Sequence, residues 1–186
     1  MSLPFTPETI GQAGLVHPSI LGPALMTECQ IDYLAAGLRG SLCLSVGAWV
    51  CGSDCLLAVR RPDIQFHAVD NWPAAEGVLR FCVAALNASL RPNVWVHRLP
   101  FCAFARVAAP VFDSVVIDAK HTLEEVRHDV RAGARLVAPG GSLYCHDYGL
   151  AGTSVQEAVD EFVAEHEWKI TDGQDTLVCL TKLERK

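Results

Sequence analysis

A glycine-bearing turn between two apolar runs constrains the fold of this chain more than any other feature. The first run is Leu42–Val46, the turn carries Gly47 and Gly52, and the second run, Phe66–Val69, ends at Asp70. Buried strands joined in this way are the units of an open α/β sheet, and glycine lets the backbone approach a ligand at the sheet edge. An acid at the tip of the second strand can accept both hydroxyls of a ribose. The segment therefore predicts a nucleoside pocket.

The glycine spacing narrows the kind of nucleoside. Four residues separate Gly47 from Gly52, so the turn is not the G-x-G-x-x-G of a dinucleotide site, and the lysine of a P-loop is missing. The looser glycine turn of S-adenosylmethionine sites remains. A nicotinamide-dependent oxidoreductase stays an alternative, because it shares the strand, the glycine turn and the acid. That class would require closer glycines and a hydride-transfer apparatus such as a Tyr-Lys pair.

Strand-like and helical patterns alternate along the rest of the chain. This alternation predicts right-handed β-α-β units and a mostly parallel sheet with helices on both faces. A terminal hairpin makes one further strand antiparallel, and Pro139-Gly140-Gly141 is predicted as a turn. The predicted strands are Leu42–Val46, Gln65–Val69, Val94–His97, Ser114–Ile117, Ser142–Cys145, Glu167–Thr171 and Thr176–Thr181, and the predicted helices are Ala24–Leu38, Ser53–Val59, Ala75–Leu90 and Thr122–Leu136.

Length and composition indicate one domain and exclude several partners. The 186 residues suit a single domain, with an N-terminal arm and helix over 1–40 (irregular over 1–23) and a core over 41–186. The net charge of −6 without a basic stripe argues against nucleic acid. No apolar run approaches the ~20 residues of a membrane span. Eight cysteines without a C-x-x-C pair, and no signal peptide, predict reduced thiols and a cytoplasmic protein. The sequence is compatible with a homo-oligomer.

Three later segments carry a resemblance to a known family. Phe112–His121 is similar to F-D-x-x-x-I-D-x-D-H, Ala138–Tyr148 to K-P-G-G-x-L-x-x-H-D-Y, and Val155–Phe162 to V-x-x-A-V-D-E-F. In this order they resemble the class I S-adenosylmethionine-dependent methyltransferases, in particular the small-molecule O-methyltransferases of macrolide-sugar and cephalosporin pathways. The resemblance implies a Rossmann-like seven-stranded sheet with an antiparallel last strand. It also implies methyl transfer to a small molecule, at oxygen.

The resemblance implies a role for each matching position. His121 would be the base, with Asp118 shaping the acceptor site, and Asp70 would hold the ribose hydroxyls. Magnesium is implied as a second cofactor, with Asp118, His146 and Asp147 as its ligands. The implied contacts to S-adenosylmethionine are Gly47, Ala48, Trp49, Gly52, Ser53, Asp70, Trp72, Pro100, Phe101, Cys102 and Asp118.

Three positions depart from the family pattern. Ser45 stands where an acid is common two residues before the first glycine, and Lys120 replaces a usual aspartate. His146 stands where metal-binding relatives often carry an acid, and imidazole is a poor ligand for Mg²⁺. These departures leave a second alternative open, a non-catalytic member that keeps the fold and binds a nucleoside or a partner protein.

Overall fold

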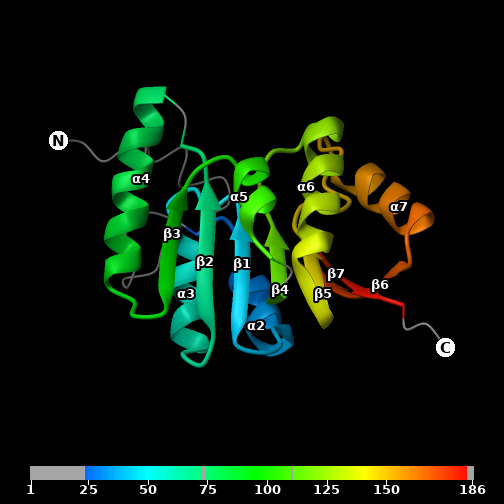
Figure 1. Ribbon diagram of the computed structural model, residues 1–186, viewed down its shortest axis with the longest axis horizontal. Helices are drawn as coiled ribbons and strands as arrows, with labels where there is room; N and C mark the ends of the chain where they lie inside the picture. The colour runs from blue at the N-terminus through cyan, green and yellow to red at the C-terminus, as the bar shows by residue number, and fades with distance from the viewer. Residues whose placement is uncertain (1–23, 73, 110, 184–186) are drawn as a thin grey trace.

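A seven-stranded sheet forms the centre of the molecule (Figure 1). The computed structural model describes residues 24–72, 74–109 and 111–183. The strands are β1 Leu42–Val46, β2 Gln65–Asp70, β3 Val94–Arg98, β4 Phe112–Ile117, β5 Val137–Cys145, β6 Trp168–Gln174 and β7 Leu177–Lys182. Their order is β3-β2-β1-β4-β5-β7-β6, with β1 to β5 parallel and β7 antiparallel to both β5 and β6. This confirms the predicted Rossmann-like sheet and its terminal hairpin.

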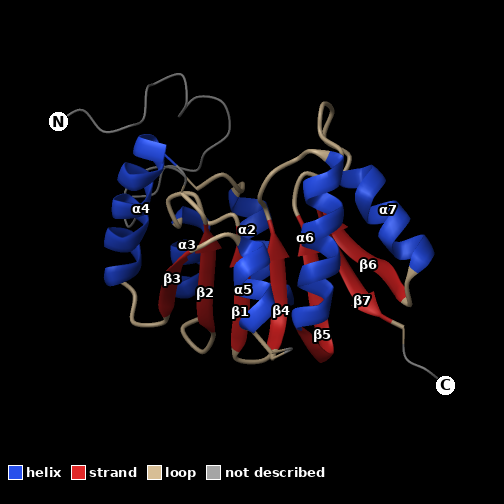
Figure 2. Cartoon of the chain, turned by 45° about the horizontal axis from the view of Figure 1, so that its top comes forward, coloured by secondary structure: helices blue, strands red, loops and turns tan. Residues whose placement is uncertain are grey.

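Helices cover both faces of the sheet (Figure 2). They are α2 Glu28–Gly37, α3 Gly52–Arg60, α4 Ala74–Ser89, α5 Phe101–Val107, α6 Leu123–Leu136 and α7 Val155–Glu165. Side chains alternate along β1, so Cys43 packs in the core beneath α2, α3 and α4, whereas Leu44 and Val46 pack beneath α5, α6 and α7. None of the described helices combines the length and apolar character that a membrane span requires.

The first described helix begins later than predicted. The apolar spacing suggested a start at Ala24, but α2 begins at Glu28 because Thr27 forms an N-terminal capping box with Gln30. The Thr27 hydroxyl accepts from the Gln30 backbone N–H at 3.3 Å, and the Gln30 side chain accepts from the Thr27 N–H at 2.9 Å. The irregular arm predicted for 1–23 lies outside the described residues.

Two further segments differ from the prediction. The helix α5 was not predicted, because its seven residues are too few to show a helical period, although it buries Phe101 and Phe104. Pro139–Gly141 was predicted as a separate turn but lies inside β5. There the register with β4 shifts between the pairs Phe112–Val137 and Ser114–Ser142. The glycines thus form an irregularity within a longer strand.

Candidate functional site

Gly47 is where the ends of β1 and β4 meet. Its φ of +92° lies in the region that favours glycine. A Cβ atom at this position would lie 1.9 Å from the carbonyl oxygen of Asp118, and the Asp118 N–H donates to the Val46 carbonyl at 2.9 Å. Only glycine allows this approach, so the turn predicted from the sequence has a steric cause.

A narrow pocket opens at this turn. Six of the predicted cofactor residues line it: Gly47, Ala48, Trp49, Gly52, Ser53 and Asp118. The other lining residues are Leu25, Met26, Ser45 and Asp54, of which Asp54 was missed because nothing in its local pattern marks a ligand. The pocket volume is about 20 Å³, far below the several hundred Å³ of a typical ligand site. A nucleoside therefore requires side chains at the pocket to move, and Leu25 and Met26, which precede α2, are among the side chains that line it.

Asp70 points at the glycine turn. One carboxylate oxygen accepts from the Trp49 N–H at 2.8 Å, and the other accepts from the Trp72 N–H at 3.3 Å. The buried indole of Trp72 donates to the Trp49 carbonyl at 2.6 Å. Neither Asp70 nor Trp72 lines the pocket, so both brace the turn from outside it. Each carboxylate oxygen of Asp70 keeps lone pairs for a further donor.

The residues predicted near adenine lie away from this pocket. Pro100 is the N-cap of α5, Phe101 is buried in the core under that helix, and Cys102 is half-buried in its first turn. None of the three lines the pocket beside Gly47. Their contact with a cofactor stays a prediction.

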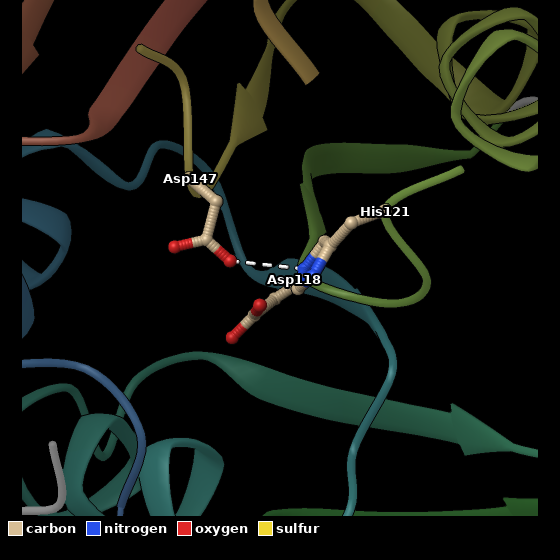
Figure 3. Close-up of side chains that lie close together, drawn as sticks. All are labelled: Asp118, His121 and Asp147. Atoms are coloured by element: carbon tan, nitrogen blue, oxygen red, sulfur yellow. Dashed lines mark ion pairs between the residues drawn. The ribbon is translucent and has the colours of Figure 1, made fainter. Parts of the chain in front are cut away.

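Asp118, His121 and Asp147 meet at the same edge of the sheet (Figure 3). Asp118 follows β4, His121 lies in the loop before α6, and Asp147 follows β5. The His121 Nε2 lies 2.9 Å from an Asp147 oxygen, and the His121 side chain is 40% exposed whereas that of Asp147 is 11% exposed. A buried acid thus orients an accessible imidazole, an arrangement that suits a general base. The sequence predicted His121 as the base but not its pairing with Asp147.

His146 is a buried positive charge beneath this cluster. Its Nδ1 lies 3.2 Å from both Asp118 and Asp147, and its Nε2 lies 3.3 Å from the side-chain oxygen of Gln30. Burial acts to lower the pKa of His146, but the hydrogen bonds and charges of Asp118 and Asp147 outweigh it and raise that pKa to about 10. Burial alone would raise the pKa of Asp147, yet the His146 contact holds it below its usual range. Gln30 was missed because it is 116 residues away in the chain.

These residues do not fit the predicted magnesium site. Both ring nitrogens of His146 are engaged, and its single positive charge already offsets part of the negative charge of Asp118 and Asp147. His121 can join the two carboxylates, since the three offer ligand atoms within 4.8 Å of one another. A set of one imidazole and two carboxylates suits a transition metal better than Mg²⁺. The chemistry of this edge is therefore derived from the side chains alone.

Lys120 does not enter the cluster. Its ammonium group forms an ion pair with Glu125 in the first turn of α6, and both groups are exposed. Thr122 is the N-cap residue of α6, and its hydroxyl donates to Glu125 at 2.6 Å. The charge of Lys120, which departs from the family pattern, therefore lies at the surface beside α6. The positive charge next to Asp118 and Asp147 is that of His146.

Comparison with known proteins agrees with this geometry. The profile of a methyltransferase-domain family matches residues 50–148, more than half of the chain. No curated protein matches the sequence. Among solved structures, cofactor-bound Rv0187 from MTB is 19% identical with a TM-score of 0.68, and the alignment covers 90% of this chain and 85% of that one.

Two O-methyltransferase structures are also similar. The Bacillus cereus enzyme in complex with SAH is 15% identical with a TM-score of 0.63, covering 84% of this chain and 82% of that one. TomG from Streptomyces achromogenes, involved in tomaymycin synthesis and solved with SAM, is 15% identical with a TM-score of 0.58, covering 83% and 78%. At these identities the structural likeness shows the fold, and the match to the family profile shows the family. The chain belongs to the methyltransferase-domain family, as a class I S-adenosylmethionine-dependent methyltransferase.

Proposed function

We propose that the protein transfers a methyl group from S-adenosylmethionine to a hydroxyl oxygen of a small molecule, with His121 as the base and Asp147 as its positioning residue. The observation that carries this proposal is the 2.9 Å pair between His121 Nε2 and Asp147. Asp118 links that pair to the cofactor pocket, because it lines the pocket and also contacts His146. Donor and acceptor sites therefore share one sheet edge.

The turn supplies the surfaces that the donor requires. Gly47 and Gly52 let the backbone approach the cofactor, and Asp70 has lone pairs left for the ribose hydroxyls. Methyl transfer is an in-line substitution at carbon, so the main task of the protein is to align the acceptor oxygen with the methyl–sulfur bond. Asp70 and Trp72 hold the glycine turn in place, and a fixed turn would keep the bound donor aligned with the acceptor.

His121 accounts for the proton of the hydroxyl group. With its Nε2–H donating to Asp147, the Nδ1 atom is the free acceptor. As the acceptor oxygen attacks the methyl carbon, the hydroxyl proton passes to Nδ1 and the carbon–sulfur bond breaks, leaving the neutral thioether S-adenosylhomocysteine. The buried His146 charge keeps Asp147 ionised, which stabilises the imidazolium that forms.

Charge and family support a small acceptor. The net charge of −6 disfavours a polyanionic substrate, and a fold neighbour is an O-methyltransferase of tomaymycin synthesis. A non-catalytic role was suggested by Ser45 and Lys120. The second of these does not disturb the site, since Lys120 pairs with Glu125. The nicotinamide alternative loses its support with the methyltransferase family match.

Turnover of labelled S-adenosylmethionine against a panel of phenols, catechols and sugar alcohols tests the proposal. We expect His121→Ala to lower kcat about 10²- to 10⁴-fold, the usual contribution of a general base, while its affinity for S-adenosylhomocysteine stays unchanged. His128→Ala is the matched control, because His128 is an exposed histidine of α6 that also pairs with an aspartate. Unchanged turnover in His121→Ala would remove His121 from the mechanism.

A further inference from the structure

A buried carboxylate faces the cofactor pocket from α3. Asp54 lies in the first turn of this helix, is only 3% exposed, and lines the pocket together with Ser45 and Gly52. The mechanism proposed above does not use it. Aspartate is rarely buried to this degree without a charged partner, so its presence here requires an explanation.

The partners of Asp54 are uncharged. The Cys51 thiol lies 3.5 Å from one carboxylate oxygen, and the Ser45 hydroxyl also hydrogen-bonds to the carboxylate. Within residues 24–72, 74–109 and 111–183, no lysine, arginine or histidine forms an ion pair with Asp54. Burial, together with the nearby charge of Asp118, raises the pKa of the Asp54 carboxyl above its ordinary value.

A ligand cation would complete this arrangement. Two carboxylates, Asp54 and Asp118, line the same narrow pocket, and Asp118 already contacts the imidazolium of His146. Asp54 has lone pairs beyond those used by Ser45 and Cys51. A cation that entered the pocket would therefore gain charge-assisted hydrogen bonds to a carboxylate that is only 3% exposed.

We propose that Asp54 binds the α-ammonium group of the methionine moiety of the cofactor. This inference rests on the proposed function, which brings S-adenosylmethionine to the glycine turn. The ribose belongs near Asp70 and the methyl group must face His121, so the amino-acid end is the part of the ligand left for the α3 side of the pocket. The ammonium group offers three donors to a carboxylate that lacks a cation. Ser45 assists by holding the Asp54 carboxylate in place.

The test compares two ligands on two proteins by calorimetry. The ligands are S-adenosylhomocysteine and its analogue without the amino group. We expect wild-type protein to bind the deaminated analogue about ten- to a hundredfold more weakly, the usual loss for a charge-assisted hydrogen bond. Asp54→Asn should lose a similar factor for S-adenosylhomocysteine but hardly any for the analogue. Asp63→Asn is the control, because Asp63 is an exposed acid just after α3.

Each result has a distinct meaning. Equal affinity of Asp54→Asn and wild type for S-adenosylhomocysteine would overturn the role of Asp54 while leaving the proposed function standing. An equal loss for both ligands would also overturn it, since the effect would then be structural. If Asp54→Asn does not fold, the exchange S45D/D54S returns one carboxylate to the pocket and should restore the preference for the amino group; loss of that preference contradicts the proposal. Wild type that binds neither ligand would refute the proposed function itself.

Discussion

The two halves of the candidate site are held together in different ways. The glycine turn after β1 is braced by hydrogen bonds between near neighbours in sequence, since Asp70 and Trp72 contact Trp49 from 21 and 23 residues away. The cluster after β4 and β5 depends on ionised side chains, and His146 reaches Gln30 across 116 residues. The first half is therefore governed by backbone geometry, and the second by charge and pH.

The largest effect should come from filling the space at Gly47. Gly47→Ala places a methyl group 1.9 Å from the Asp118 carbonyl oxygen at a φ of +92°, so we expect a loss of at least about 3 kcal/mol in the free energy of unfolding. Gly152→Ala is the matched control, because Gly152 has a φ of +84° with no atom within 4 Å. That variant should lose only about 1 kcal/mol. Urea denaturation measures both losses. Equal losses would show that the positive φ alone, without the contact to the Asp118 carbonyl oxygen, explains why position 47 requires glycine.

Removing the buried charge of His146 should lower the free energy of unfolding by a comparable amount, and this loss should depend on pH. His146→Gln leaves Asp118 and Asp147 without their cation, so we expect a loss of about 3–5 kcal/mol at pH 6. His128→Gln removes an exposed histidine beside Asp129 and should cost less than about 1 kcal/mol. If His146→Gln lost no more free energy of unfolding than His128→Gln, the claim that charge holds the second half of the site together would be contradicted.

The pH dependence of stability gives the sharper comparison. The pKa of His146 is raised from its ordinary 6.5 to about 10, so its stabilising contribution is fully present below pH 6.5 and is lost as the pH rises toward 10. Between pH 6 and 8.5 the wild type should lose about 2 kcal/mol, and His146→Gln should not show this loss. Urea titrations at the two pH values measure it. A wild-type curve that is flat over this interval would mean that His146 is neutral in the folded protein.

The sequence predicted the first half of the site better than the second. Strand β1 was predicted with its observed bounds, and Gly47 and Asp70 lie where their spacing placed them. Local patterns were sufficient there because the contacts are between adjacent strands. The start of α2 and the helix α5 were not predicted, since a capping box overrode the apolar spacing at one and the other is too short to show a period.

The second half shows what local patterns cannot reveal. The family resemblance identified His146 as a candidate ligand, but its charge depends on contacts with Asp118 and Asp147, and Asp118 is brought to it only by the fold. In the same way, Lys120 gave no sign that it would turn toward Glu125. Asp54 was overlooked because burial, which makes it unusual, is a tertiary property.

Calorimetric titration of wild type and Asp70→Ala with S-adenosylhomocysteine, and separately with NAD, tests the central claim most directly. We predict that the wild type binds S-adenosylhomocysteine and not NAD, and that Asp70→Ala, with its fold verified by circular dichroism, binds at least about tenfold more weakly because it lacks the acceptor for the ribose hydroxyls. Binding of NAD alone, or full affinity for S-adenosylhomocysteine in Asp70→Ala, would contradict the account.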